Sequence, residues 1–379
     1  SRAAGHVGTA SLTMTLANPL PVDGHVFMEF PPQFHSIAST AVTAMTGIDG
    51  NFVVSVSGHE VGVMRSGGGN EVAAGSEVML TLDGIRNQLF EGESSPFPLV
   101  KTTLADPGVS IDDSTQGPGM ASFSFAAAAL VDVGSTSQYD VAGMETAISF
   151  SFTVVNPLPA NSALYVEFPG GFSSVSPVLA ESDEVGPLTV SGSFALLSVR
   201  DGFGSVIPED TTVSVSFSTV INRDSIGDTG DFTITTFTDS SMQHRIDVGI
   251  AASLVVGKQL LSMSAAFGSS FVAVAAQNKR WTFFGHGVAL GDQVKWIGST
   301  AASDDDCTDW DAQEVDVDGI DGDSSTTNLI FAEGSEPTGP LQLCYRFSTG
   351  NHPFKLYPAI TLDVYELYSV VAAEEGSKS

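Results

Sequence analysis

One proline-rich pattern occurs twice in this sequence, and it constrains the fold more than any other feature. Residues 18–34 read NPLPVDGHVFMEFPPQF and residues 156–172 read NPLPANSALYVEFPGGF, 138 positions apart. Each proline removes a backbone donor and fixes φ, and the residue before it is pushed towards an extended conformation. Such a segment leaves one strand and crosses between sheets or along an edge. We expect Phe34 and Phe172 to fill the core at the following turn.

The similarity extends along about two-thirds of the chain as a tandem repeat. Apolar residues that alternate with Ser or Thr, the period-2 pattern of a half-buried strand, match between the copies. The matched positions are Leu12, Met14 and Leu16 with Phe150, Phe152 and Val154, Val78, Leu80 and Leu82 with Val213, Val215 and Phe217, and Ile111-Asp112 with Ile246-Asp247. The inward faces of the two copies are therefore expected to be the same.

Strand-like runs separated by Gly, Pro, Asn and Asp clusters, without a segment of 3.6-residue period, predict an all-β protein. A chain of 379 residues is long enough for three domains. We predict three tandem immunoglobulin-like β-sandwiches, at residues 1–117, 118–252 and 253–379. The first two are the repeat pair, and the third is a sandwich of a different type.

The charge balance limits the partners. Forty-four acidic and fourteen basic residues give a formal charge of -30, which repels phosphate backbones, so nucleic acid is not expected as a partner. The sequence has no run of 18 apolar residues, so membrane insertion is not expected. It also lacks an Asn-x-Ser/Thr site, so any glycan would be O-linked.

No catalytic motif can be assembled from the sequence, and we expect that the protein is not an enzyme. A Gly-x-Ser-x-Gly elbow, a phosphate-binding glycine loop and a His-Glu-x-x-His pair are all absent. Glu29 and Glu167 are the only ionisable groups held in both copies of the proline-rich pattern. Each stands alone beside a core-facing Phe, so we expect them to be solvated or to protect a sheet edge.

The densest polar constellation is the acidic segment 303–325, SDDDCTDWDAQEVDVDGIDGDSS. Calcium takes six to eight oxygen ligands, and Asp316, Asp318, Asp321 and Asp323 are candidate ligands. Their spacing departs from the Asp-x-Asp-x-Asp-Gly pattern, and a charged, solvated loop is the alternative interpretation. No other cofactor is expected.

Cys307 and Cys344 are the two cysteines of the chain. They fit a single disulfide within the last domain and therefore an oxidising, extracellular compartment, with two buried free thiols as the alternative. If they pair, the chain-entropy model gives roughly 4 kcal/mol of stabilisation for the loop that they close.

Several stretches together resemble large secreted repeat proteins of algae and related protists. They are NPLP…VEFPGGF with GIRNQL and TTLAD, then GHGVALGDQVKWIG, DDDC, LCYRF and FKLYPAITLDV, and they span nearly the whole chain. The resemblance implies immunoglobulin-like modules of cell-surface and flagellar-hair (mastigoneme-type) proteins, hence a structural role at a cell or flagellar surface. It implies no catalytic residues, and it implies a disulfide between Cys307 and Cys344.

One segment of the second copy has no counterpart in the first. The first module lacks an equivalent of residues 117–137, including the strand-like run MASFSFAAAAL at 120–130. A sandwich short of one strand exposes unpaired backbone groups and a hydrophobic slot. Either a segment of a neighbouring subunit near Tyr365 to Ser379 completes it in a head-to-tail polymer, or the strand was lost or lies upstream.

These patterns predict an extracellular structural protein, a subunit of a filament or surface hair assembled head to tail from copies of itself. The alternative is a cell-surface adhesin or ligand-binding module for sugar or calcium. Its ligands would meet the acidic loops and the aromatic side chains of Trp281, Trp296 and Trp310. Aromatic residues in such strands more often belong to the core.

Overall fold

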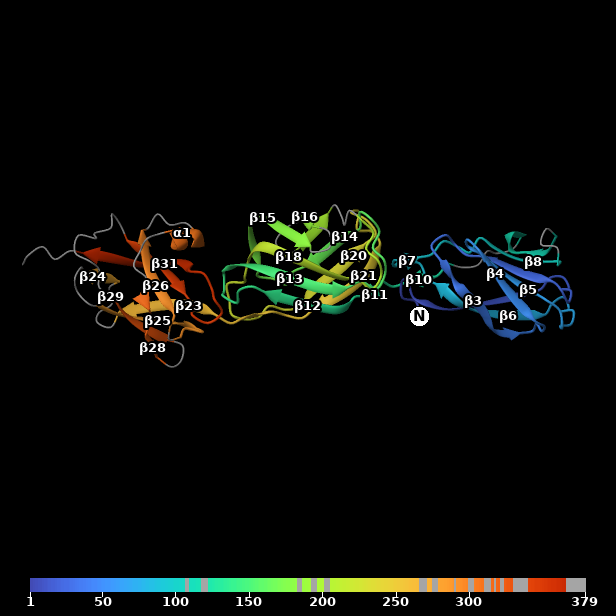
Figure 1. Ribbon diagram of the computed structural model, residues 1–379, viewed down its shortest axis with the longest axis horizontal. Helices are drawn as coiled ribbons and strands as arrows, with labels where there is room; N and C mark the ends of the chain where they lie inside the picture. Colours follow the sequence, from blue (N-terminus) through green and yellow to red (C-terminus); the bar gives the residue numbers. More distant parts are fainter. Residues whose placement is uncertain are drawn as a thin grey trace, which may run out of the picture.

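The computed structural model arranges three β-sandwiches in a row along its long axis (Figure 1). Domain 1 surrounds a core contributed by Leu12 to Phe125, domain 2 a core contributed by Leu130 to Ala251, and domain 3 a core built mainly from Leu260 to Val364. The structure describes residues 1–105, 109–116, 122–182, 186–191, 196–200, 205–265, 271–274, 279–289, 291–298, 303–309, 315–316, 318–320, 324–329 and 340–365.

Domain 2 consists of two facing sheets. One sheet has the strand order β12-β13-β18-β15 and the other β11-β21-β20-β14-β17, and β16 pairs with both β15 and β17. This arrangement corresponds to the ABED and GFC sheets of an immunoglobulin domain, with β16 and β17 as an added hairpin. The strands are β11 (Ala128–Ala129), β12 (Val131–Ser137), β13 (Glu145–Thr153), β14 (Ala163–Glu167), β15 (Ser173–Ser182), β16 (Gly186–Ser191), β17 (Leu196–Arg200), β18 (Thr212–Ile221), β20 (Phe232–Phe237) and β21 (Arg245–Ala251).

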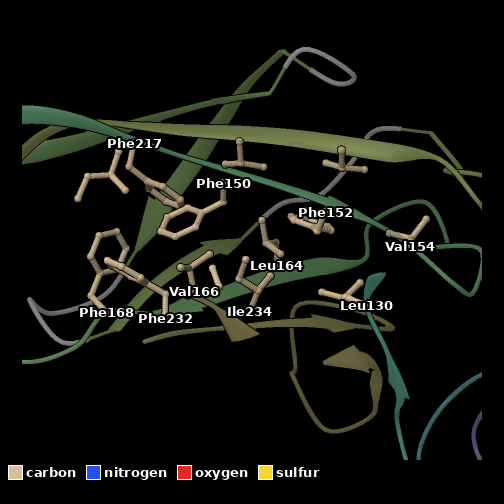
Figure 2. Close-up of a cluster of buried hydrophobic side chains, with 14 of the residues drawn as sticks. Leu130, Phe150, Phe152, Val154, Leu164, Val166, Phe168, Phe217, Phe232 and Ile234 are labelled. Carbon is tan, nitrogen blue, oxygen red and sulfur yellow. The ribbon is translucent and has the colours of Figure 1, made fainter. Parts of the chain in front are cut away.

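The core of domain 2 follows from the alternation in its strands. Along β13, Ile148, Phe150 and Phe152 are buried while the serines between them are half-buried on the outer face. Figure 2 shows the phenylalanine side chains gathered between the two sheets. The ring centroids of Phe150 and Phe232 lie 5.1 Å apart, in the edge-to-face arrangement that aromatic quadrupoles favour.

Domain 1 repeats this architecture, which confirms the tandem repeat. Its sheets have the orders β1-β6-β3 and β4-β5-β2-β8-β9. The proline-rich pattern crosses from one sheet to the other, and it makes the same bridge in both domains, Leu20 to Val72 and Leu158 to Ile207. The strands are β1 (Val7–Thr15), β2 (His25–Glu29), β3 (His35–Thr46), β4 (Phe52–Ser57), β5 (Glu60–Arg65), β6 (Glu77–Arg86), β8 (Leu99–Thr103) and β9 (Ser110–Asp113), followed by the short helix η1 (Ser114–Gln116).

Each repeat also carries a small two-stranded ribbon at the end where it meets the next domain. In domain 1, β7 (Gly92–Glu93) pairs with β10 (Ser124–Phe125), and in domain 2, β19 (Gly227–Asp228) pairs with β22 (Val255–Val256). Phe125 packs into the core of domain 1, so the chain enters domain 2 after this residue.

Domain 3 has sheets of the orders β23-β25-β29-β28 and β24-β31-β30-β26-β27. The predicted fold class, all-β with immunoglobulin-like sandwiches, is thereby confirmed. This sandwich differs from the repeat pair by a short helix that a disulfide ties to the sheet. Its elements are β23 (Gln259–Ala265), β24 (Val272–Val274), β25 (Lys279–His286), β26 (Gln293–Gly298), α1 (Asp304–Asp309), β27 (Val315–Asp316), β28 (Asp318–Ile320), β29 (Ser324–Leu329), β30 (Leu341–Arg346) and β31 (Lys355–Tyr365).

The disulfide joins Cys307 of α1 to Cys344 of β30, and both residues are fully buried. They pack with Ile297, Phe354 and Leu356 in a small cluster beside the main core of domain 3. The disulfide therefore fixes α1 against the sheet.

Replacing both cysteines, Cys307→Ala with Cys344→Ala, should lower the free energy of unfolding of domain 3 by about 4 kcal/mol. The reason is the loop-closure entropy that the bond removes from the unfolded chain. Differential scanning calorimetry checks this, because the unfolding transition of domain 3 should shift and those of domains 1 and 2 should not. Unchanged transitions in the double variant would contradict the prediction.

Candidate functional site

The carboxylates predicted as candidates do not meet in one site. Glu29 and Glu167 end β2 and β14 as exposed side chains, which fits the expected solvated role. Asp316 and Asp318 lie on β27 and β28, where only the backbone is described, and Asp321 and Asp323 lie outside the described residues. Within the described part of the chain, no three His, Cys, Asp or Glu side chains could hold a metal ion together. The calcium site stays a prediction.

The tryptophans belong to the core rather than to a ligand surface. Trp281 is 0% exposed and Trp296 5% exposed, and their ring centroids lie 6.4 Å apart within the core of domain 3. Neither ring offers a face to a sugar, so the adhesin alternative loses two of its three aromatic residues. Trp310 lies outside the described residues.

The most distinctive feature is an open edge on domain 1. In domain 2, β12 pairs antiparallel with β13, and β11 lies parallel to β21, so one leading segment covers the same edge of both sheets. Domain 3 has the same arrangement, in which β23 pairs with β25 and β24 lies parallel to β31. Among the described residues of domain 1, β1 pairs only with β6 and β9 only with β8. Within these described residues, no segment therefore takes the place of the leading strand.

The leading segment differs in form from the strand-like run predicted at 120–130. Among the described residues of that run, Ser124 and Phe125 form β10 and pair with β7 within domain 1. The leading strand of domain 2 is β11 with β12, which follow that ribbon after a short alanine run. The physical reason is Phe125, which the core of domain 1 buries and thereby separates from the alanines that follow.

Two adjoining cavities lie along the open edge of domain 1. One of about 440 Å³ lies between β1 and strands β8 and β9, and its apolar lining includes Met14, Leu16 and Val100. The other, of about 230 Å³, lies towards the start of β1. Leu12 borders both. The second cavity is lined by Ala10, Leu12, Met28, Ile85 and the phenylalanines Phe30, Phe34, Phe97, Phe123 and Phe125, with Arg2 and His6 among its polar residues. We call this pair of cavities along β1 the slot.

In domain 2 the leading segment occupies the corresponding place. Leu130 is buried in the core, as Figure 2 shows, and its backbone N–H donates to the carbonyl of Val248 at 2.9 Å. Val133 packs against the same core from β12. A Cβ on Gly249 would meet the side chains of both at 2.8 Å, so glycine is needed there for the leading segment to approach. Backbone pairing and these two anchors together close the sandwich.

A second repeated feature is an asparagine–aspartate pair beside the slot, which sequence reasoning did not find. The Asn18 side chain donates to Asp112 Oδ1 at 2.8 Å, and the Asn156 side chain donates to Asp247 Oδ1 at 2.8 Å. The signal was present, because this asparagine opens both proline-rich patterns and the Ile-Asp dipeptide is repeated. The pair ties the crossing segment to the last strand of each repeat.

The two copies of this pair differ in their surroundings. Asn18 is exposed, whereas Asn156 and Asp247 are fully buried at the junction with domain 1, where Asn156 also donates to the carbonyl of Ala4 at 3.4 Å. Burial raises the pKa of Asp247, and hydrogen bonds from Asn156 and Val155 oppose that rise. Domain 1 therefore covers the asparagine–aspartate pair of domain 2, whereas the asparagine of its own pair, Asn18, stays exposed.

Ion pairs hold domain 2 at both ends. Arg86 and Glu209 pair across the first junction, as do Arg245 and Glu91, at 2.5 Å. At the second junction Lys258 lies 3.0 Å from Asp140 and 2.7 Å from Nε2 of the buried His352. Burial, together with Lys258, lowers the pKa of His352 below its ordinary value. These contacts fix which ends of the domains meet. The end of domain 1 that carries Asn18 therefore faces away from the other two domains.

No protein-family model matches this sequence, and no curated protein matches it either. The C-terminal domain of the antigen I/II-family protein AspA of Streptococcus pyogenes is a structural neighbour with 9% identity, covering 67% of this chain and 94% of its own, at a TM-score of 0.26. The major pilin subunit BcpA of Bacillus cereus has 8% identity, covering 96% of this chain and 99% of its own, also at 0.26. The fold is taken from the strand order described above. Within the described residues, no helix is long and apolar enough to cross a membrane.

The asparagine–aspartate pairs give a matched test. Asn156→Ala should lower the free energy of unfolding of domain 2 by about 2–3 kcal/mol at pH 7, because the buried Asp247 carboxylate loses a donor. Asn18→Ala, at the exposed copy, should cost domain 1 less than about 1 kcal/mol. Differential scanning calorimetry of both variants and of the unchanged chain measures both, because domain 1 has no Trp or Tyr whose fluorescence could report its unfolding.

The pH dependence of the Asn156→Ala deficit separates a charge effect from a packing effect. Because the pKa of Asp247 is raised in the folded state, its protonated form favours folding, and this contribution fades as the pH rises from 3.8 through the folded value. Without Asn156 that pKa rises further, so the deficit should be larger at pH 7 than at pH 4. An equal deficit at both pH values would show that only packing was lost.

Proposed function

We propose that this protein is an extracellular structural subunit, which assembles head to tail into a filament or surface hair, and that a strand from a neighbouring copy completes domain 1. The observation that supports it is the open place of the leading strand, which is filled in domains 2 and 3. An exposed edge with an apolar slot beside it is a ready template for an added strand.

The order of the domains suits polymerisation. Domains 1 and 3 lie at opposite ends of the row, and the N-terminus lies beside the junction of domains 1 and 2 (Figure 1). A contact between the free end of domain 3 and the free end of domain 1 is heterologous, so it can repeat along an axis without closing. The expected donor near Tyr365 to Ser379 continues from β31, although residues after Tyr365 lie outside the described residues.

The remaining features fit a structural role outside the cell. The buried disulfide of domain 3 is a bond of oxidising compartments. Pairing of backbone groups and burial of apolar side chains would hold the filament together, so we propose no catalytic activity and no cofactor beyond the predicted calcium. The sequence resemblance supports the finer proposal of a flagellar-hair subunit, carrying O-linked glycans if any.

Filling the slot within the same chain tests this proposal. A copy of residues 126–138, AAAALVDVGSTSQ, placed directly before Ser1 keeps the spacing that the repeat has in domain 2. We expect the added segment to raise the melting temperature of domain 1 and to abolish filaments of the purified protein seen by electron microscopy, because the acceptor site is occupied.

The matched control carries aspartate at the counterparts of Leu130 and Val133 in the added segment. It should neither stabilise domain 1 nor stop assembly, because charged side chains cannot enter an apolar slot. Filaments that persist when the melting temperature shows the slot to be filled would contradict the proposal. So would an unmodified chain that stays monomeric at every concentration tested.

A further inference from the structure

The cavity of about 230 Å³ in domain 1 arises from smaller side chains at repeat positions. Ala10 stands where domain 2 has Ile148, and Leu12 stands where it has Phe150. In domain 2 both larger side chains are at most 1% exposed, and Phe150 packs edge-to-face on Phe217 with centroids 5.9 Å apart. Domain 1 has Leu82 at the position of Phe217. The volume that domain 2 fills from within is therefore open in domain 1.

This difference sets the chemistry of the strand that domain 1 accepts. In domain 2, the β12 residues opposite Phe150 and Ile148 are the small residues Ser135 and Ser137. A strand paired in the same way along β1 would place its corresponding residues beside Leu12 and Ala10 and over the cavity. An apolar cavity of about 150 Å³ accommodates a benzene ring, so this one can accept a large apolar side chain.

We infer that the strand completing domain 1 is the run LYSVVAA, residues 367–373, of a second copy, with bulky apolar side chains inserted into the cavity beside Ala10 and Leu12. This inference rests on the proposed function and names its donor. The run contains no charged residue. As a strand it would present Tyr368, Val370 and Ala372 on one face, all able to enter an apolar slot.

Charge complementarity supports the pairing and its direction. A donor antiparallel to β1, as β12 is to β13, would end near the start of β1. Arg2 and His6 line the cavity at that end, in a chain with only fourteen Lys and Arg residues. Glu374 and Glu375 follow the apolar run directly, so they would arrive beside these basic side chains.

The distance that the chain can span after β31 decides whether the run 367–373 completes domain 1 of its own chain or of a second copy. β31 starts at Lys355, whose Nζ donates to the carbonyl of Gly143 in domain 2, and its 11 residues span roughly 36 Å towards the free end of domain 3. Residues 366–379 extend at most about 50 Å. To return to domain 1 they would pass the length of β31 and then domain 2, whose strand β13 alone adds roughly 30 Å. The run 367–373 starts two residues after Tyr365, the end of β31, so the domain 1 that it can reach is that of another copy.

A synthetic peptide of residues 365–379 tests the inference. The receptor is the full chain carrying Tyr368→Asp and Val370→Asp, so that its own segment does not compete. We expect the peptide to bind, measured by isothermal titration calorimetry, and to raise the melting temperature of domain 1. A peptide carrying the same two aspartates should not bind, and neither should the chain whose slot is filled by the added residues 126–138.

A receptor with Ala10→Ile and Leu12→Phe, which introduces the residues found at the matching positions of domain 2, tests the role of the cavity by itself. It should fold, as circular dichroism checks, and bind the peptide at least about tenfold more weakly, because its cavity is filled. As a second readout, Tyr368→Ala with Val370→Ala in the peptide should weaken binding to the unfilled receptor. Equal binding in either comparison would overturn the role of the cavity.

The outcomes distinguish this inference from the function on which it rests. If the peptide does not bind, but filling the slot within the chain abolishes filaments, then another segment is the donor, and the inference is wrong while the proposed function stands. If filaments persist with the slot filled, the proposed function itself fails.

Discussion

The closure of one sandwich edge is the constraint on which the rest of this structure depends. An immunoglobulin-like domain has two sheets whose inner faces are apolar, and its leading segment pairs with both sheets at the same edge. In domain 2 that segment brings Leu130 and Val133 over the core, and in domain 3 β23 and β24 do the same. Domain 1 has the inner faces and the slot but, among its described residues, no strand across them. Its edge is the place where another chain can gain backbone pairing and apolar burial at once.

The contacts at the domain junctions determine which end of domain 1 is covered by domain 2 and which end is free. Asn156 and Asp247 are buried because the Ala4 turn of domain 1 covers them, and the ion pairs at both ends of domain 2 fix which faces meet. The equivalent pair of Asn18 and Asp112 stays at the free end of domain 1. The free end of domain 1 therefore carries an exposed copy of the pair that is buried at the first junction, an asymmetry that suits the proposed head-to-tail assembly.

Much of this could be predicted from the sequence because the relevant signals are local. The alternation around Phe150 gives the strands, the prolines give the crossing between sheets, and comparing the two copies shows the absent segment. What could not be predicted depends on contacts between distant residues. The break after Phe125 comes from its burial in the preceding core. The structure also aligns Thr102 with Thr236, since each hydroxyl accepts a hydrogen bond from the backbone N–H of the repeated aspartate.

The cavity of domain 1 shows that comparing two repeats reveals differences in core packing only when the register of strand pairing is known. Leu12 and Phe150 both count as core residues in a periodicity argument, and neither reveals unfilled volume. The pairing of β12 with β13 places Ser135 and Ser137 opposite Phe150 and Ile148, so in domain 2 small residues on one strand face large residues on the next. If an added strand completes domain 1 as proposed, the same balance would place larger residues on that strand. A close-packed interior leaves little void space, so the small side chains on β1 fit the larger ones that we propose for the added strand.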